Sequence, residues 1–218
     1  MTEAILNANR DTWVQSNLAN YTFGTGTTLI CRMNYQRILI GFDLSSIPSG
    51  ASISSAKITV TSNGNFTTAT YSIYAISDAN GDWIEGTDYL QIVNGSPCWN
   101  YKEYDTTSWA GSAGLSTSGT DYINTVLGSY TGTMSNATAY DIDLNDDGIT
   151  LLESIIGGGN NNGFLLKSTK NNETSFFSSE YSQSNYRPKL TINYSSGGNL
   201  LKINMNAQMK DMRGGMNG

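Results

Sequence analysis

The residue types best suited to chemistry are concentrated in one stretch, SPCWNYKEYDTTSW, at residues 96–109. Two tryptophans and two tyrosines alternate there with charged and amide side chains, in a chain otherwise rich in Ser, Thr, Asn and Gly. An aromatic face can pack on the apolar face of a pyranose, while Asn and acidic side chains accept hydrogen bonds from sugar hydroxyls. The stretch therefore predicts a surface that contacts a glycan or a neighbouring subunit. Its residues are Trp99, Tyr101, Tyr104, Trp109, Asn100 and Asp105.

The same aromatic rings have a purely structural interpretation. Buried rings can fix a long loop onto a sheet, each contributing a few kcal/mol when well packed. Alternation along an extended chain places Trp99 and Tyr101 on one side, as expected for a strand edge that packs inward. Loop anchoring and glycan stacking thus both remain open for this stretch.

A second set of oxygen-bearing residues suggests a calcium site. Residues 143–148, DLNDDG, fit the first half of a calcium-binding loop, with Asp141 before it and Glu153 after it. The twelfth position of such a loop, where a bidentate acid is needed, is Ser154. The candidate calcium ligands are Asp141, Asp143, Asn145, Asp147 and Glu153. The alternative is a turn followed by a helix N-cap, which uses the same residues.

Catalysis has little support in the sequence. The chain contains no histidine, the commonest general base and transition-metal ligand. A glycosidase needs two carboxylates placed across a cleft, and nothing selects a pair among the acids of the central loops. These acids are Asp82, Glu85, Asp88, Glu103, Asp105 and Asp121. We therefore predict a protein that is not an enzyme.

Charge and hydropathy exclude two classes of partner. The net charge is −6 and no basic stripe occurs, so nucleic-acid binding is not expected. No segment approaches the ~20 apolar residues of a membrane span, and the first residues lack the pattern of a secretory signal. Cys31 and Cys98 have no metal-ligand spacing, and are either a disulfide pair or two buried thiols.

The elements that must position these residues are short alternating runs separated by turns, which indicate an all-β, antiparallel sandwich. Both faces of RILIGFDL are partly apolar, so residues 37–44 are predicted as a central strand. Predicted strands span residues 29–33, 37–44, 52–62, 68–76, 138–144, 164–168, 175–179 and 189–194.

One or two short helices and long end loops complete the predicted fold. Residues 149–156 follow Asp146-Asp147-Gly148 and precede three glycines, so they form the better helix; residues 120–127 form the second. Residues 110–136 are expected to be long loops at one end of the sandwich. We divide the chain into a domain at 1–194 and a Gly/Met-rich tail at 195–218, which cannot bury a core alone.

Several fragments, taken in order, carry a family resemblance. They are DTWV (11–14), FGTGTTL (23–29), RILIGFDLSSIPSGA (37–51), ISSAKI (53–58), WIEGT (83–87), WNY (99–101), NGFLL (162–166), FSSE (177–180) and RPKL (187–190). The chain from about residue 11 to 194 resembles the DNRLRE-domain family, jelly-roll β-sandwiches related to disaggregatase repeats and carbohydrate-binding modules. The resemblance implies a non-catalytic module that binds polysaccharide or serves as an accessory domain of surface and phage virion proteins. The chain departs from the family at residues 141–143 and in its inserted NDDG.

The function predicted from these observations is structural. We expect an oligomeric surface or decoration protein of a bacteriophage virion, assembled in the host cytoplasm, with its jelly-roll body exposed. Residues 196–218 would dock onto other capsid or tail proteins, and a host-surface glycan is a further expected partner. The alternative is a carbohydrate-binding module or adhesin of a bacterial surface or polysaccharide-degrading system, secreted or attached to the cell surface.

Overall fold

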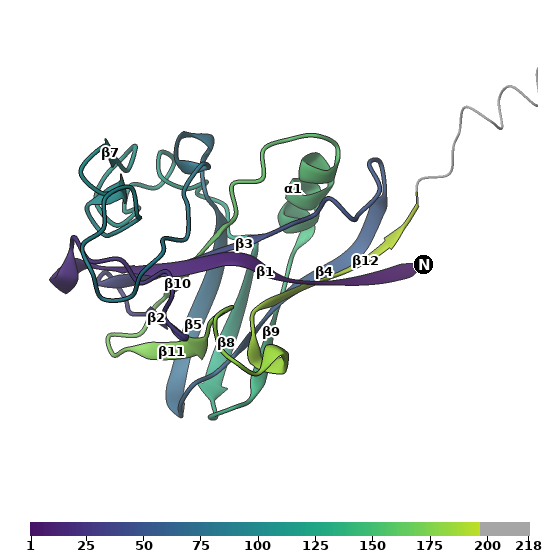
Figure 1. Ribbon diagram of the computed structural model, residues 1–218. Helices are drawn as coiled ribbons and strands as arrows, with labels where there is room; N and C mark the ends of the chain where they lie inside the picture. Colours follow the sequence, from purple (N-terminus) through teal and green to yellow (C-terminus); the bar gives the residue numbers. More distant parts are fainter. Residues whose placement is uncertain (197–218) are drawn as a thin grey trace, which may run out of the picture.

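The computed structural model describes residues 1–196 as an antiparallel jelly-roll β-sandwich, which confirms the predicted fold class (Figure 1). The strands of its two main sheets are β1 (Thr2–Gln15), β3 (Gln36–Phe42), β4 (Ser52–Thr61), β5 (Phe66–Ala75), β8 (Gly128–Met134), β9 (Ala139–Asp143), β10 (Phe164–Ser168) and β12 (Lys189–Ser195). Sheet 1 has the order β1-β12-β4-β9 and sheet 2 the order β1-β3-β10-β5-β8. Along the chain, the strands from β3 to β5 and from β8 to β12 alternate between sheet 2 and sheet 1. This alternation is the jelly-roll connection.

The long first strand belongs to both sheets. Residues 2–7 of β1 pair with β12, and residues 8–15 pair with β3 after a register shift between Ala8 and Arg10. Such an irregularity bends a strand and increases its twist, which lets β1 pass from one sheet to the other. The sequence did not predict this strand, because its first half is only partly buried and mixes Glu3, Ala4 and Asn7 with few β-branched residues.

The core fills the space between the two sheets. Ile38, Ile40 and Phe42 of β3 point into it and pack with apolar side chains from β4, β5, β9, β10 and β12. The alternate residues of β3 are also buried, because a further layer covers the outer face of sheet 2. This burial of every residue confirms the prediction of a central strand at residues 37–44.

Helix α1 (Asp146–Ile156) contacts β4 and contributes Leu152 and Ile156 to the core. Its N-cap is Asn145, whose side-chain oxygen accepts a hydrogen bond from the Gly148 N–H at 3.0 Å. The predicted helix is therefore confirmed. The second predicted helix, at residues 120–127, is wrong: these residues form turns and bends.

The smaller elements revise the predicted loops. Strand β8 lies within the predicted loop region 110–136 and pairs with β5 along most of its length. Strands β2 (Thr28–Cys31) and β11 (Thr174–Phe177) form a separate pair, as do β6 (Tyr101–Glu103) and β7 (Thr107–Ser108). Three single turns of 3₁₀ helix occur at Ser16–Leu18, Asp78–Asn80 and Ser184–Tyr186. The predicted tail lies almost wholly outside the described residues.

Candidate functional site

Residues 77–127 form a loop layer, which covers much of the outer face of sheet 2 (Figure 1). Outward side chains of three neighbouring strands, Val14, Leu39 and Leu165, pack there against side chains of this layer. The loop residues in this second apolar cluster are Trp83, Trp109, Leu115 and Tyr122, with Trp99 packed against it. The layer is thus held by a small core of its own.

The aromatic stretch is part of that core. It forms the β6–β7 hairpin, and Asp105 occupies its turn with a φ of 66°. Trp109 is only 4% exposed, and its indole N–H donates to the Cys98 carbonyl at 2.9 Å. The Trp109 ring therefore anchors the hairpin from within and leaves little surface for the predicted contact with a ligand or subunit.

Of the other candidate residues in the stretch, Trp99, Asn100, Tyr101 and Tyr104 are half-buried and Asp105 is exposed. Trp99 packs so closely on Gly114 that a Cβ atom there would come within 2.6 Å of its ring. Asn100 donates from its amide to the Asn20 side-chain oxygen at 2.8 Å, which ties the hairpin to the chain after β1. Tyr101 and Tyr104 form an edge-to-face pair with ring centroids 5.6 Å apart. The loop-anchoring interpretation accounts for Trp99, Asn100 and Trp109.

Beside the loop layer, the outer face of sheet 2 carries a basic pocket of about 260 Å³. Arg37, Tyr74 and Lys167 stand on three adjacent strands, β3, β5 and β10, and Arg32 approaches from the β2–β3 turn. The remaining lining residues are Met33, Asn34, Gln36, Ser72, Ser168 and Thr169. The pocket therefore combines three cations, an aromatic ring, and several hydroxyl and amide groups.

Each cation of the basic pocket is held in place by neutral groups. Arg37 lies over the Trp99 ring at 5.0 Å and donates to the Gly114 carbonyl, and burial lowers the pKa of its guanidinium. Lys167 donates to the Tyr122 hydroxyl at 2.8 Å and lies over that ring. In the described part of the chain, no carboxylate forms a salt bridge with Arg32, Arg37 or Lys167. Their positive charge is therefore not neutralised by a salt bridge, although Arg37 itself is only 7% exposed.

The predicted calcium ligands around residues 141–153 have other partners. Asp141 binds Lys57 at 2.6 Å and the Thr59 hydroxyl at 2.6 Å, and Glu153 accepts from the Ile53 N–H at 2.9 Å. Asn145 caps α1. Among the described residues, no three acids of this group lie close enough together to share a metal ion. Asp143 and Asp147 are exposed. The structure shows the alternative, a turn followed by a helix cap, at these residues, and calcium binding by the five residues stays a prediction from the sequence.

Asp121, one of the acids considered for hydrolysis, organises the loop layer. It is fully buried, and its two carboxylate oxygens accept from the backbone N–H groups of Gly111, Ser112 and Thr117 at 2.8–3.0 Å. The Asn80 amide donates to it as well, at 3.0 Å. A carboxylate saturated in this way is a structural group.

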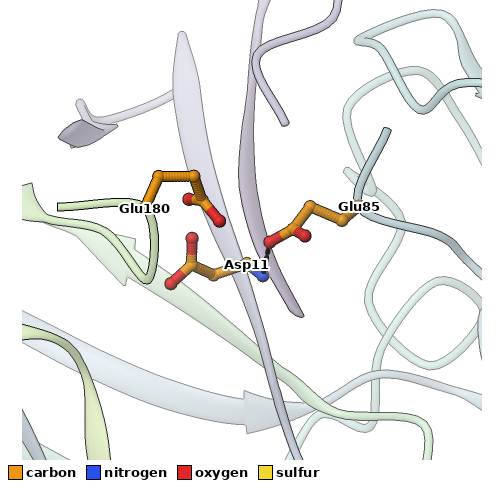
Figure 2. Close-up of side chains that lie close together, drawn as sticks. All are labelled: Asp11, Glu85 and Glu180. Carbon is orange, nitrogen blue, oxygen red and sulfur yellow. Dashed lines mark hydrogen bonds between the residues drawn. The ribbon is translucent and has the colours of Figure 1, made fainter. Parts of the chain in front are cut away.

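A different set of acids does converge. Asp11 of β1, Glu85 of the loop layer and Glu180 from the β11–β12 connection each bring one carboxylate oxygen within 4.8 Å of the others. Figure 2 shows the three side chains directed toward one another from three segments of the chain. Among residues 1–196 this is the one group of three His, Cys, Asp or Glu side chains that could share a metal ion. We call it the acidic triad.

Hydrogen bonds hold the triad but leave two of its oxygens without partners. Asp11 accepts from the Ser179 N–H at 2.8 Å, and Glu85 accepts from the Asp11 N–H at 2.6 Å. Asp11 is 0% exposed, and its Oδ1 has no hydrogen-bond partner; the same is true of Glu180 Oε2. Burial and the neighbouring Glu180 carboxylate raise the pKa of Asp11 well above its usual range. Burial also raises the pKa of Glu85, to about 7.

Cys31 and Cys98 are both buried and unpaired, which confirms the thiol interpretation over a disulfide. Burial raises the pKa of the Cys31 thiol, so it behaves as a small apolar group.

Comparison with known proteins identifies one related family. Residues 2–87 match carbohydrate-binding module family 96, a match that covers less than half of the chain. It runs from β1 through β5 into the loop layer, and so includes Arg32, Arg37 and Tyr74 of the basic pocket and Asp11 and Glu85 of the triad. This supports a domain of carbohydrate-binding-module type. No curated protein matches the chain.

No helix in the described range has the length and apolar character needed to cross a membrane.

The basic pocket could hardly be predicted from the sequence. Arg37, Tyr74 and Lys167 are far apart in the chain and each looks like an ordinary outward residue of a strand. What joins them is the strand order β3-β10-β5, a long-range property. The one indication in the sequence was a single cation in each of two otherwise largely apolar strands, Arg37 in β3 and Lys167 in β10.

Proposed function

We propose that this protein is a non-catalytic carbohydrate-binding module whose ligand, a polysaccharide with carboxylate groups, lies in the basic pocket. The family match over residues 2–87 supports carbohydrate as the class of ligand. The observation that carries the choice of site is the set of three cations beside Tyr74, none of which forms a salt bridge within residues 1–196, in a protein of net charge −6.

The pocket chemistry suits such a sugar. A guanidinium or ammonium group forms strong charge-assisted hydrogen bonds with a carboxylate. The Tyr74 ring offers a face for the pyranose, and the Ser72 and Thr169 hydroxyls and the Gln36 amide are suited to ring hydroxyls. Because Arg37 and Lys167 are held by Trp99 and Tyr122, the cations are positioned before a ligand arrives.

The virion location, oligomeric state and docking of residues 196–218 stay predictions from the sequence, since residues 197–218 lie outside the described part. A phage particle that displays this module would present the basic pocket to a host glycan. The secreted or cell-surface alternative places the same pocket on a bacterial polysaccharide.

Lys167→Met tests the site directly. The change removes the ammonium group while keeping a long apolar side chain, and we expect affinity for a uronate-containing polysaccharide to fall by at least about tenfold. Isothermal titration calorimetry of the full chain measures this, at low ionic strength where screening is weak.

The matched control is Lys57→Met, which removes the same charge from sheet 1, where Lys57 pairs with Asp141. Its affinity should equal that of the wild type. Equal weakening in both variants would mean that only the net charge matters, and unchanged binding in Lys167→Met would exclude the basic pocket.

A further inference from the structure

The acidic triad places three carboxyl groups in a largely buried position without a salt-bridge partner among residues 1–196. The Arg10 charge opposes the rise in the pKa of Glu85, but the guanidinium itself donates to the Trp83 carbonyl at 2.5 Å and lies over the Trp83 ring at 4.2 Å. No salt bridge reaches Asp11, Glu85 or Glu180 in the described part of the protein. Buried charges in proteins are paired or coordinate metals. A cation bound between the three carboxylates would therefore stabilise this arrangement.

The unpartnered oxygens point to where the cation would lie. Asp11 Oδ1 and Glu180 Oε2 are buried without a hydrogen-bond partner, while the other Asp11 oxygen accepts from the Ser179 N–H. A buried carboxylate oxygen left unsatisfied is costly. A metal ion among the three carboxylates would satisfy both of these atoms together.

We propose that Asp11, Glu85 and Glu180 bind one calcium ion. Two oxygens that share a calcium ion at 2.3–2.6 Å lie no more than about 5 Å apart, and the three ligand atoms lie within 4.8 Å of one another. The carboxylates come close enough to coordinate the ion without a change of backbone. Ser179 Oγ, which contacts Glu180 at 2.8 Å and Glu85 at 3.4 Å, is a further oxygen beside the site.

The ligand set favours calcium over other biological cations. Zinc prefers His and Cys, the chain has no histidine, and neither cysteine belongs to the triad. Magnesium keeps several waters and seldom occupies a cage made of protein groups alone. Three carboxylates from three chain segments, one of them fully buried, form a protein cage for a hard ion with flexible geometry.

The ion would connect parts of the molecule that are distant in sequence. Asp11 lies in the shared strand β1, Glu85 near the start of the loop layer, and Glu180 in the connection from β11 to β12. A cation at this point fastens the loop layer and the last connection onto the first strand. Calcium is therefore expected to act on folding stability.

The test uses the full chain, stripped with a chelator and titrated with CaCl₂. Calorimetry should show one ion bound per chain, and a calcium concentration 100-fold above Kd should raise the melting temperature by roughly 5–10 °C. MgCl₂ at the same concentration should give a smaller rise. Absence of calcium binding by the wild type would overturn the proposal, leaving three carboxyl groups that share protons.

Variant Glu180→Gln separates the triad from the other acidic group. In the presence of chelator, Glu180→Gln removes one of three neighbouring carboxyl groups that have no bound cation. The melting temperature of the variant should therefore equal or exceed that of the wild type. In calcium the order should reverse, because the variant loses a ligand and at least about tenfold in affinity.

The matched control is Glu153→Gln, which belongs to the group at residues 141–153 and should keep the wild-type calcium response. A response lost in Glu153→Gln and kept in Glu180→Gln would place calcium at the other group and refute the proposal.

Discussion

At the scale of single residues, Asp121 shows how one buried carboxylate organises a segment that has little regular structure. Its oxygens gather three backbone N–H groups from residues 111–117 and the Asn80 amide. Gly111 makes this approach possible, because a Cβ atom there would lie 2.7 Å from an Asp121 oxygen. The loop layer thus depends on a polar centre as well as on Trp83 and Trp109.

Asp121→Asn should be strongly destabilising. Each carboxylate oxygen accepts backbone donors, so an amide NH₂ at either position faces an N–H group and leaves it unsatisfied. A buried unsatisfied donor costs about 1–3 kcal/mol, so we expect a loss of about 2–5 kcal/mol in the free energy of urea unfolding. The control is Asp105→Asn in the exposed hairpin turn, which should change stability by less than about 0.5 kcal/mol. A similar small change for Asp121→Asn would contradict this role.

The aromatic stretch illustrates what residue type alone can predict. Its composition fits both a sugar platform and a loop anchor, and these differ only in which way the rings face. Trp109 faces inward, where its indole N–H donates a hydrogen bond to the Cys98 carbonyl of the same aromatic stretch. That outcome depends on the fold of residues 96–109 against sheet 2, which no local pattern specifies.

At the scale of elements, the sequence predicted those strands that alternate clearly or are apolar throughout. Strand β10 has the predicted bounds, and β3, β4, β5, β9 and β12 lie within about two residues of theirs. Strands β1 and β8 were missed for physical reasons. The first half of β1 is only partly buried, and β8 is a polar, Gly-containing strand, so both form through pairing with neighbours rather than from intrinsic preference.

Helix α1 offers a prediction at this scale. Asn145→Ala removes the side-chain oxygen that accepts from Gly148 and the amide that donates to the Val126 carbonyl. We expect a loss of about 1–2 kcal/mol in unfolding free energy, measured in urea. Asn145→Asp keeps a capping oxygen and should lose less. An alanine variant as stable as the wild type would show that the cap contributes nothing.

At the scale of the whole molecule, the two outer faces of the sandwich have different roles. Sheet 1 exposes short polar and paired charged residues, such as Lys57 with Asp141. Sheet 2 carries the loop layer and, next to it, the basic pocket. The loop layer takes part in both proposed sites. It contributes Glu85 to the acidic triad beside β1, and its Trp99 packs against Arg37 in the wall of the basic pocket.

The proposed function requires that the protein bind a carbohydrate through carboxylate groups of the ligand. The most direct test compares one uronate-containing polysaccharide with its carboxyl-reduced form, in which the same chain carries neutral hydroxymethyl groups. Calorimetry with the full-length protein should show binding to the first and affinity at least about tenfold lower for the second. Equal affinity for the two forms, or binding to neutral polysaccharides alone, would contradict the account.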